Sequence, residues 1–569
     1  MFDSQTRPRI LDSLRFLYGT QAEAAMEGLT GLAEAFAADN PRVAGAARVI
    51  PHDAVLITYA DQVRDPPEAP LAGLKRWADE RLAGVLGTIH ILPFFTWSTD
   101  EGFSVKDYHA VSPDFGDWGD IDALAEHFTL MFDAVVNHAS REGTWFKAFA
   151  AGEAPYTGFF REVTEADDLS NVVRPRTTPL THVYQTSRGP KRLWTTFSAD
   201  QVDLDYANPD LLLAVIEVLL FYAAHGARLI RLDAIGYIWK ESGASCIHLE
   251  GAHRIIQLVR DVFDAVAPDV LLVTETNVPH AENISYFGAD HDEAQMVYNF
   301  SLPPLLLDGV YTGSAKRLSD WAASLDLPRP GCAFFNITAT HDGIGVRGAQ
   351  DYMTPQEIDG LAEKTLARGG LVSYRQLSDG SQTPYELNIT FFDALLPPGE
   401  DPDSDTAITR YMTAQSVALA LRGVPGIYFH NLLGSRSDHA ALEGKDATQT
   451  EFKRVTNRKR LTLAEIEATL ADVSGRGRRV FDAYCRRLKV WRETPEFAPD
   501  SPQTVLALDD RVLAIRRGET LYCLHNLSGD SVTVERPAAG ALNDILSGDT
   551  LPDGPVRLGP WAMAWLKAE

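Results

Sequence analysis

The stretch Gly226–Tyr237, GARLIRLDAIGY, decides the fold that the sequence predicts. A parallel strand that is buried on both faces is almost continuously apolar, and Leu229–Leu232 has that character except at Arg231. Side chains two residues apart on a strand point to the same side, so Arg231 and Asp233 should meet. An arginine beside a carboxylate lowers its pKa and keeps it ionised at neutral pH. Taken alone, the pair is either a structural ion pair or part of an active site.

Similar short apolar segments alternate with helix-like segments along most of the chain. The strands are expected near Ala54–Tyr59, Thr88–Leu92, Leu130–Val136, Arg228–Leu232, Val270–Thr274, Met296–Phe300, Ala333–Ile337 and Gly426–Phe429. Eight strands with interposed helices predict an α/β fold, a parallel (β/α)8 TIM barrel. Active sites of such barrels lie at the C-terminal ends of the strands.

The remaining segments divide the chain around this barrel, which carries inserted loop subdomains and a C-terminal all-β domain. The intervals after the third and seventh strands are too long for simple loops, and insertions at that face usually shape a binding cleft. We expect an N-terminal helical extension over 1–50, barrel segments over 51–138, 206–342 and 406–494, an inserted domain B over 139–205, an inserted cleft subdomain over 343–405, and a C-terminal β domain over 495–569.

Composition limits the partners and the compartment. The 569 residues carry a net charge of −26, which argues against binding to nucleic acid or to an anionic membrane surface. No apolar run is long enough for a membrane helix, and no signal peptide precedes the first helix-like segment. The four cysteines are far apart and form no metal-binding or disulfide pattern, so we expect a cytoplasmic protein. Homodimerisation stays open.

Acidic residues follow several of the predicted strands. Asp133 lies at the end of the third, Asp233 follows the fourth, Glu275 follows the fifth, and His341-Asp342 follows the seventh. Like charges that converge on one pocket repel, so stability alone gives no reason to gather them. Such carboxylates suit glycosidic chemistry, with Asp233 as the ionised nucleophile and Glu275, desolvated by its apolar strand, as the protonated acid.

Five segments in this order, GFSVKDY, DAVVNH, RLDAIGY, TETN and ATHD, resemble the strand-end motifs of the α-amylase clan of retaining glycosidases and transglycosylases. The resemblance implies Asp233 as nucleophile, Glu275 as general acid/base and Asp342 as transition-state stabiliser. The clan's calcium-binding loop is not evident, so neither a metal nor another cofactor is expected. The implied shell around the glucosyl unit consists of Phe103, Asp107, His138, Arg231 and His341.

Within the clan, longer segments are similar to sucrose phosphorylase and its relatives. They are RLDAIGYIWKESGASC, FSADQ, HDGIGV, PYELNITFFDAL and Arg174-Pro175-Arg176. The resemblance implies that Arg176 and Tyr385 bind phosphate and that Gln201 and Tyr237 line the acceptor side. Guanidinium groups bind phosphate through paired, charge-assisted hydrogen bonds, so Arg174 joins Arg176 as a candidate. The alternative for both arginines is a solvated turn.

Two departures from sucrose phosphorylase concern the acceptor. Asn277 stands where that enzyme has a histidine, and Glu386 stands where it has a glutamine. With the N-terminal extension, these features resemble the branch that contains glucosylglycerate phosphorylase, which forms α-glucose 1-phosphate and D-glycerate from 2-O-α-glucosyl-D-glycerate and phosphate. Both phosphate and glycerate are anions, and the candidates for a shared basic pocket are Arg174, Arg176, Arg347 and Arg375.

Several alternatives remain at this point. Other donors within the phosphorylases are sucrose, sucrose 6′-phosphate and glucosylglycerol. A hydrolase or transglucosidase of the same clan would act without phosphate. A non-catalytic member of the clan would typically lack a catalytic acid, whereas Asp233, Glu275 and Asp342 are all present.

Overall fold

The computed structural model describes residues 2–41, 50–290, 292–327, 331–377, 379–446 and 450–569. Residues 42–49, which belong to the predicted N-terminal extension, lie outside the described residues. Eight parallel strands close into a barrel in the order β1-β18-β14-β13-β12-β11-β6-β3, so the predicted TIM barrel is confirmed. The strand ends differ from the predicted ones by at most two residues: β1 Val55–Thr58, β3 Thr88–Ile91, β6 Thr129–Ala134, β11 Ala227–Leu232, β12 Leu271–Thr274, β13 Met296–Tyr298, β14 Ala333–Ile337 and β18 Val424–Tyr428.

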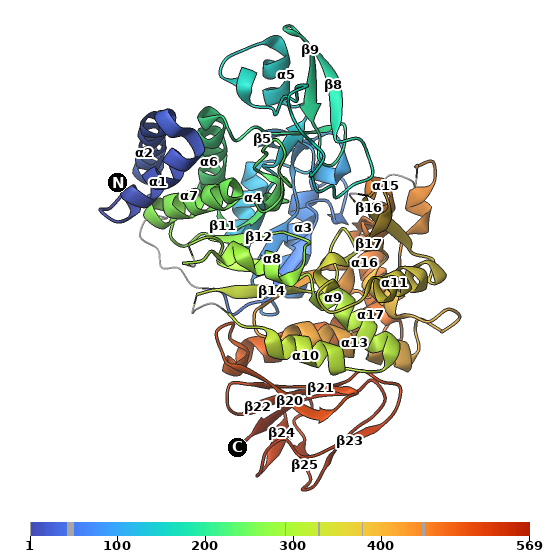
Figure 1. Ribbon diagram of the computed structural model, residues 1–569. Helices are drawn as coiled ribbons and strands as arrows, with labels where there is room; N and C mark the ends of the chain where they lie inside the picture. The colour runs from blue at the N-terminus through green and yellow to red at the C-terminus, as the bar shows by residue number, and fades with distance from the viewer. Residues whose placement is uncertain (1, 42–49, 291, 328–330, 378, 447–449) are drawn as a thin grey trace.

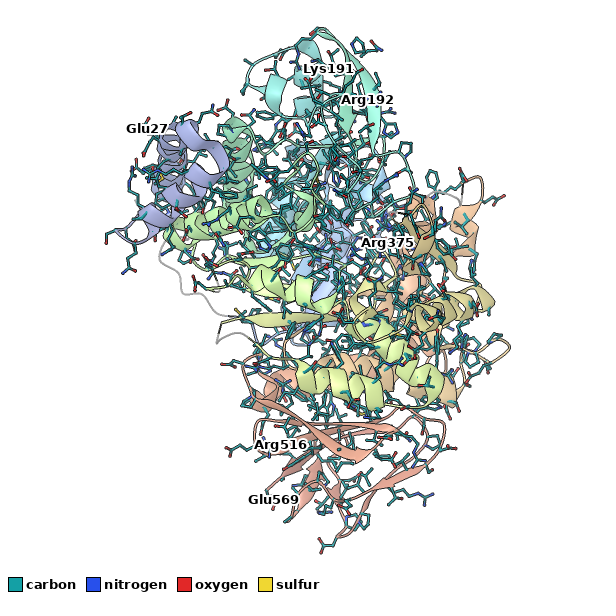
Figure 2. The ribbon with its side chains drawn as sticks, viewed as in Figure 1. Glu27, Lys191, Arg192, Arg375, Arg516 and Glu569 are labelled. Carbon is teal, nitrogen blue, oxygen red and sulfur yellow. The ribbon has the colours of Figure 1, made fainter. Side chains whose placement is uncertain are left out.

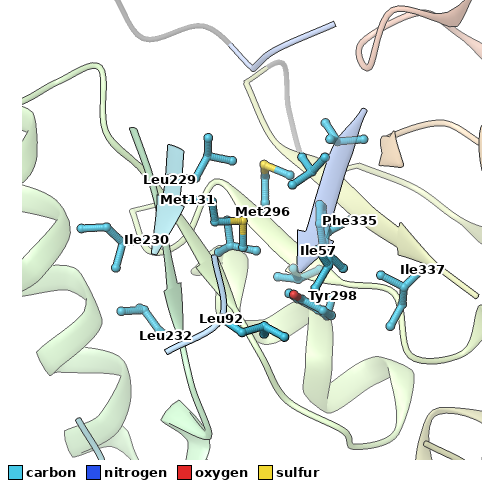
Figure 3. Packing of buried hydrophobic residues seen from close by; sticks show 14 of the residues in the cluster. Ile57, Leu92, Met131, Leu229, Ile230, Leu232, Met296, Tyr298, Phe335 and Ile337 are labelled. Atoms are coloured by element: carbon cyan, nitrogen blue, oxygen red, sulfur yellow. The ribbon is translucent and has the colours of Figure 1, made fainter. Parts of the chain in front are cut away.

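Alternation along each strand separates the barrel interior from the layer beneath the helices. In Figure 3, Leu229, Met131 and Met296 gather between the strands, whereas Ile230 and Leu232 point toward the surrounding helices. All five side chains are buried. Arg231 is on the same side of β11 as Leu229, one layer closer to the strand's C-terminal end. The apolar packing therefore ends where the polar chemistry begins.

Helices surround the barrel, and the N-terminal pair adds a further layer on one side. In Figure 1, α1 (Thr6–Tyr18) and α2 (Ala22–Asp39) lie against α6 (Pro209–Ala224) and α7 (Glu250–Val266). The contact is close, since a Cβ atom on Gly28 would lie 2.6 Å from Leu213 Cδ1. Other helices around the barrel are α3 Pro70–Leu82, α4 Trp118–Ala125, α8 His280–Ile284, α9 Leu302–Thr312, α10 Lys316–Ser324, α13 Asp405–Ala420, α14 Phe429–Leu432, α16 Leu463–Ala471 and α17 Arg476–Glu493.

Two insertions leave the barrel, one after β6 and one after β14. The first carries β7 (His138–Ser140), α5 (Thr144–Ala151), the hairpin β8 (Thr181–Thr186) and β9 (Gly189–Trp194), and β10 (Gln201–Asp203). The second carries β15 (Ile344–Gly345), α11 (Pro355–Ala367), β16 (Leu371–Gln376), β17 (Gln382–Asn388) and α12 (Phe391–Leu395). A backbone bridge between Arg174 and Gln376 joins the two insertions. They therefore meet above the barrel instead of standing apart.

The C-terminal region is all-β, as predicted. A six-stranded sheet has the order β20-β21-β22-β27-β24-β25, and it packs below α10 and α13 in Figure 1. Its bounds are β20 Gln503–Asp509, β21 Val512–Arg517, β22 Leu521–Asn526, β24 Leu542–Asp544, β25 Thr550–Leu551 and β27 Met563–Ala568, with β23 Val532–Val534 paired to β26 Val556–Leu558. Among the helices of the described residues, none has the length and apolar character to span a membrane. The domain limits that the sequence predicts remain a proposal.

Candidate active site

Arg231, near the end of β11, binds the carboxylates that meet at the barrel mouth. Its Nη1 donates to Asp233 Oδ1 at 2.8 Å and also contacts Asp133 Oδ1 on the adjacent strand β6. Its Nη2 lies 3.8 Å from Glu275 Oε2. Arg231 and Asp133 are almost completely buried. The alternation on β11 thus brings Arg231 and Asp233 together, and the barrel closure adds Glu275 and Asp133.

Burial, more than the arginine, controls the charge of Asp233. Desolvation raises the pKa of Asp233 to about 6; Arg231 lowers it, and Asp133 and Asp342 raise it. The expectation that Arg231 would bring this pKa below its ordinary value is therefore wrong, because burial of the carboxyl outweighs Arg231, and the nearby Asp133 and Asp342 raise the pKa further. Asp233 still ionises below neutral pH. Its Oδ2 is the oxygen that Arg231 does not bind.

Glu275 holds its proton to a higher pH than Asp233 does. Desolvation raises its pKa to about 7, Arg231 lowers it, and the neighbouring Asp233 raises it further. Its Oε2 accepts a hydrogen bond from the backbone N–H of Ala234 at 3.1 Å. Ala234 has a φ of 48°, a left-handed conformation uncommon for a residue with a side chain, and this turn directs its N–H toward Glu275. The two carboxyls are thus one ionised group and one that readily carries a proton.

Asp342 is held as an anion by two arginines that lie late in the chain. Arg454 Nη1 and Arg458 Nη2 each lie 3.0 Å from Asp342 Oδ1. Although burial opposes ionisation, the positive charges of Arg454 and Arg458 bring the pKa of Asp342 well below its usual range. The same two arginines also contact Asp100, at 3.5 and 3.2 Å. Asp342 and Asp100 therefore share one pair of cations.

Glu386, for which the sequence offered no clear partner, also belongs to this network. Arg454 donates from Nη2 to Glu386 Oε1 at 2.6 Å and from Nε to Oε2 at 3.1 Å, a two-bond arrangement with matched geometry. Glu386 is buried, and Arg454 is as well. Glu386 on β17 is thereby linked through Arg454 to Asp342 after β14.

Aromatic and amide groups complete the carboxylate-rich end of the pocket. The rings of Phe103 and His341 are stacked, with centroids 4.9 Å apart and an interplanar angle of 4°. The backbone carbonyl of Phe103 lies 2.9 Å from His138 Nε2 and accepts from Gln201 Nε2 at 3.1 Å. Burial lowers the pKa of His138 and of His341, so both imidazoles are neutral hydrogen-bonding groups.

A second end of the pocket is rich in arginine but poor in carboxylate. The guanidinium carbon of Arg176 lies 5.3 Å from the ring centroid of Phe197 and 5.4 Å from that of Tyr385. Cations favour such positions over aromatic faces. Arg347 and Arg375 lie nearby and, together with Arg176, influence the Tyr237 hydroxyl electrostatically. Among the described residues, none of these three arginines forms an ion pair with an acidic side chain.

The pocket encloses about 760 Å³ of space, part of it open to solvent. Five predicted residues are not among those that line it: Arg231, which lies behind the carboxylates, Arg347, Arg375, Asp107 and Arg174. Asp107 lies outside the pocket, where its Oδ1 accepts from the His109 N–H, and Asp100 takes the pocket-lining position instead. Arg174 also lies outside, donating to Gln376 Oε1 and to the Thr178 carbonyl, so it joins the two insertions. The predicted residues that line the pocket are Phe103, His138, Arg176, Gln201, Tyr237, Asp233, Glu275, Asn277, His341, Asp342, Tyr385 and Glu386.

Sequence reasoning missed Asp100, Arg454 and Arg458. Asp100 lies two residues before Gly102-Phe103, and the positive φ of Asp100 (52°) and of Glu101 (50°) gives the loop a sharp turn there. A signal for the arginines was present, since Lys453–Arg460 contains five basic residues in an acidic chain. Within the part of the chain that the structure describes, no group of three or more His, Cys, Asp or Glu side chains is arranged to bind a metal ion.

Comparison of the sequence with known proteins identifies the family of this chain. The model of the α-amylase catalytic domain matches residues 84–315. A glucosylglycerate phosphorylase from Allomeiothermus silvanus is 48% identical, over 94% of each chain. The chain belongs to the glucosylglycerate phosphorylase branch of the α-amylase family. A sucrose phosphorylase from Agrobacterium vitis is 31% identical, over 70% of this chain and 81% of that protein.

A solved structure supports the fold. The crystal structure of sucrose 6F-phosphate phosphorylase from Thermoanaerobacter thermosaccharolyticum matches with a TM-score of 0.74 and 22% identity, covering 89% of this chain and 99% of that one. Relatives named glucosylglycerate phosphorylase are therefore more similar in sequence than the sucrose phosphorylase, over a larger share of the chain.

Proposed function

We propose that this protein is a retaining glucosylglycerate phosphorylase. It converts 2-O-α-D-glucosyl-D-glycerate and phosphate to α-D-glucose 1-phosphate and D-glycerate. The observation that carries the proposal is the division of one pocket into two ends: carboxylates paired with arginines at one, and at the other the lining residue Arg176, which has no acidic partner among the described residues, with Arg347 and Arg375 close enough to influence Tyr237. The first end suits the positive charge that develops on the glucosyl unit in the transition state. The second suits the binding and release of the anions glycerate and phosphate.

The first half of the reaction transfers the glucosyl unit to the enzyme. Asp233 Oδ2 attacks the anomeric carbon, because Oδ1 is bound by Arg231. Glu275 donates its proton to the glycosidic oxygen, so that glycerate departs as an alcohol. Asp342 and Asp100 face the sugar as anions that stabilise positive charge and bind hydroxyl groups.

The second half releases the glucosyl unit to phosphate. A phosphate oxygen attacks the anomeric carbon from the face that glycerate has left, and the bond to Asp233 breaks. Glu275, now ionised, accepts the proton that the attacking oxygen carries. Two displacements at one carbon restore its configuration, so the product is the α-anomer.

The arginines explain why phosphate competes with water. Arg176 lines the pocket between Phe197 and Tyr385, where a phosphate would meet a guanidinium as well as a Tyr385 hydroxyl. Glycerate and phosphate are both anions, and both must stand next to the same anomeric carbon in turn. One basic region therefore serves both steps, although the contacts within it need not be the same.

Cytoplasmic location and homodimerisation are part of this proposal. Cys246, Cys485 and Cys523 are free, and Cys246 and Cys523 are buried, which fits a reducing compartment. The product α-glucose 1-phosphate is a charged ester, which does not cross membranes unaided. Light scattering coupled to size-exclusion chromatography would test the dimer.

Phosphate release from α-glucose 1-phosphate tests the reaction most directly. The purified protein is supplied with this donor and, separately, with D-glycerate, fructose, fructose 6-phosphate and glycerol. We expect the highest kcat/KM with D-glycerate. A preference for fructose, fructose 6-phosphate or glycerol would assign the protein to another phosphorylase. Release of free glucose from glucosylglycerate at a rate independent of phosphate would make it a hydrolase.

A further inference from the structure

Arg347 is a buried cation on a rigid segment that follows the pocket-lining residue Gly345, although Arg347 is not itself a lining residue. It begins the short helical turn Arg347–Ala349 after β15 and is 6% exposed. The preceding N–H, of Val346, donates to the Tyr385 carbonyl at 3.1 Å, and the following carbonyl, of Gly348, accepts from Ser301 Oγ at 2.6 Å. A Cβ atom on Gly348 would lie 2.5 Å from the Phe300 backbone, so this segment packs tightly. The position of Arg347 is therefore fixed on both sides.

The guanidinium group of Arg347 lacks the partners that a buried cation requires. Its Nε and Nη1 are inaccessible to solvent and have no hydrogen-bond partner among the described residues. A buried guanidinium without a paired carboxylate costs several kcal/mol of stability. By contrast, the buried Arg231, Arg454 and Arg458 are each bound to carboxylates. Several other buried arginines have an unpartnered Nε, but among the described residues Arg347 is the one arginine whose Nη1 is unpartnered as well, which favours a ligand over a structural role.

Other unpartnered polar groups lie around Arg347. The Tyr237 hydroxyl, Asn277 Oδ1 and Arg375 Nε are buried without hydrogen-bond partners among the described residues. Tyr237 and Asn277 line the pocket, and Arg347 is the cation that most strongly lowers the pKa of Tyr237, although burial raises it. Arg375, labelled in Figure 2, stands on β16, and like Arg347 it is not itself one of the residues that line the pocket. Burial and the nearby Arg347 lower its pKa, as expected for two cations with no anion between them.

Glu282 is the acidic side chain closest in electrostatic terms to these two arginines. It is half exposed and pairs with His248, whose Nε2 lies 3.2 Å from Glu282 Oε2. Its pKa is lowered first by that hydrogen bond and less by Arg347 and Arg375. Glu282 therefore leaves the two guanidinium groups available for a small anion.

We infer that Arg347, assisted by Arg375, binds the carboxylate of the acceptor acid and so determines the preference for D-glycerate over neutral acceptors. This inference rests on the proposed function. A planar guanidinium matches a carboxylate through two parallel hydrogen bonds. Asn277 then faces the hydroxyl groups of the same acid. It packs against β15, since a Cβ atom on Gly345 would lie 2.6 Å from Asn277 Nδ2.

Arg176 is assigned to phosphate instead. It is half-buried, lies between two aromatic rings, and reaches the pocket from the first insertion rather than from the barrel side. Its polar atoms are not orphaned: Nη1 donates to the Pro175 carbonyl at 3.3 Å. Arg176 is therefore stable without a bound anion, because it is only half-buried. Arg347 is buried and unpartnered, so it should bind an anion whose shape matches its guanidinium group.

The substitution Arg347→Gln separates the two anions. In the synthetic direction, with α-glucose 1-phosphate as donor, we expect KM for D-glycerate to rise about 30-fold, with KM for glycerol changed less than about threefold. In phosphorolysis at saturating glucosylglycerate, KM for phosphate should change less than about threefold. An unchanged KM for D-glycerate, or equal rises for D-glycerate and phosphate, would overturn the inference.

Two further variants keep this result interpretable. Arg347→Lys retains the charge but not the two-bond geometry, and should recover part of the affinity for D-glycerate through KM rather than kcat. Arg192→Gln, on an exposed residue of β9 labelled in Figure 2, is the matched control and should leave all constants unchanged. If the unsubstituted protein releases no phosphate with D-glycerate, the proposed function fails. If the unsubstituted protein does release phosphate with D-glycerate, and Arg347→Gln has the same kinetic constants as the unsubstituted protein, the inference about Arg347 fails and the proposed function stands.

Discussion

The two ends of one pocket use arginine in opposite ways. At the glucosyl end, Arg231, Arg454 and Arg458 each contact at least two carboxylates. At the acceptor end, Arg347 and Arg375 retain unpartnered N–H groups, and Arg176 lies between aromatic rings. The same residue type therefore has two roles, and its partners decide which. A paired arginine fixes a carboxylate, whereas an unpaired one awaits an anionic ligand.

The difference matches what each end must do during turnover. The glucosyl unit stays in place through both displacements, so the groups that bind it benefit from being held rigidly before it arrives. The acceptor end exchanges glycerate for phosphate between the two steps. If its arginines formed ion pairs with carboxylates of the protein itself, the positive charge that attracts both anions would be neutralised. The rest of the protein, with a net charge of −26, repels anions.

The strongest test of the glucosyl end is Asp233→Asn. Because an amide does not form the glucosyl-enzyme, we expect kcat/KM for glucosylglycerate in phosphorolysis to fall by roughly 10⁴-fold or more. The reverse reaction should slow to the same extent with every acceptor. The variant should remain folded. Burial raises the pKa of Asp233, so its ionised form destabilises the folded state as pH rises, and a neutral amide removes that cost. Near-normal turnover would exclude Asp233 as nucleophile; a lowered unfolding temperature at pH 8 would contradict the electrostatic argument.

The pH profile of kcat/KM tests the paired carboxyls next. Activity requires ionised Asp233, so it should rise through about pH 6; it also requires protonated Glu275, so it should fall through about pH 7. Because the two groups interact, the limits belong to the pair. Glu275→Gln should lower the rate roughly 10²- to 10⁴-fold and abolish the alkaline limb. An alkaline limb that persists in Glu275→Gln would assign the proton to another group.

At the acceptor end, Arg176→Ala should affect phosphate specifically. Loss of a charge-assisted contact is expected to raise KM for phosphate about 30-fold, with the donor KM nearly unchanged. Arg174 is the matched comparison two residues away, because it faces Gln376 and Thr178 instead of the pocket. Arg174→Ala should raise KM for phosphate by less than about threefold. Equal effects of both substitutions on that constant would mean that the loop, not Arg176 alone, binds phosphate.

The sequence predicted the glucosyl end better than the acceptor end, for physical reasons. Strand alternation and strand-end acids are local patterns, so the eight strands and the meeting of Arg231 with Asp233 and Glu275 followed from them. Which side chain of a loop faces a pocket depends on the turn. The sharp turn at Asp100 places it, and not Asp107, in the pocket lining.

Long-range pairing lies beyond local patterns altogether. Arg454 lies 68 residues after Glu386 and more than a hundred after Asp342, and only the closed fold brings the three together. The pKa of Asp233 was predicted in the wrong direction for the same reason. The sequence placed one acid beside Arg231, whereas the closed fold buries Asp233, which raises its pKa most, and adds Asp133 from the adjacent strand.

Glu386→Gln gives the smallest expected effect and decides to which end Glu386 belongs. The resemblance to sucrose phosphorylase implied the acceptor side, but its carboxylate binds Arg454 through two hydrogen bonds, and Arg454 in turn lies 3.0 Å from Asp342 Oδ1. Glutamine would loosen Arg454, so kcat should fall about 10-fold while KM for D-glycerate stays within about twofold. Glu363→Gln, on the exposed face of α11, is the control. A group that only positions Arg454 affects glucosyl transfer and not the affinity for the acceptor. A raised KM for D-glycerate with unchanged kcat would therefore show that Glu386 belongs to the acceptor end.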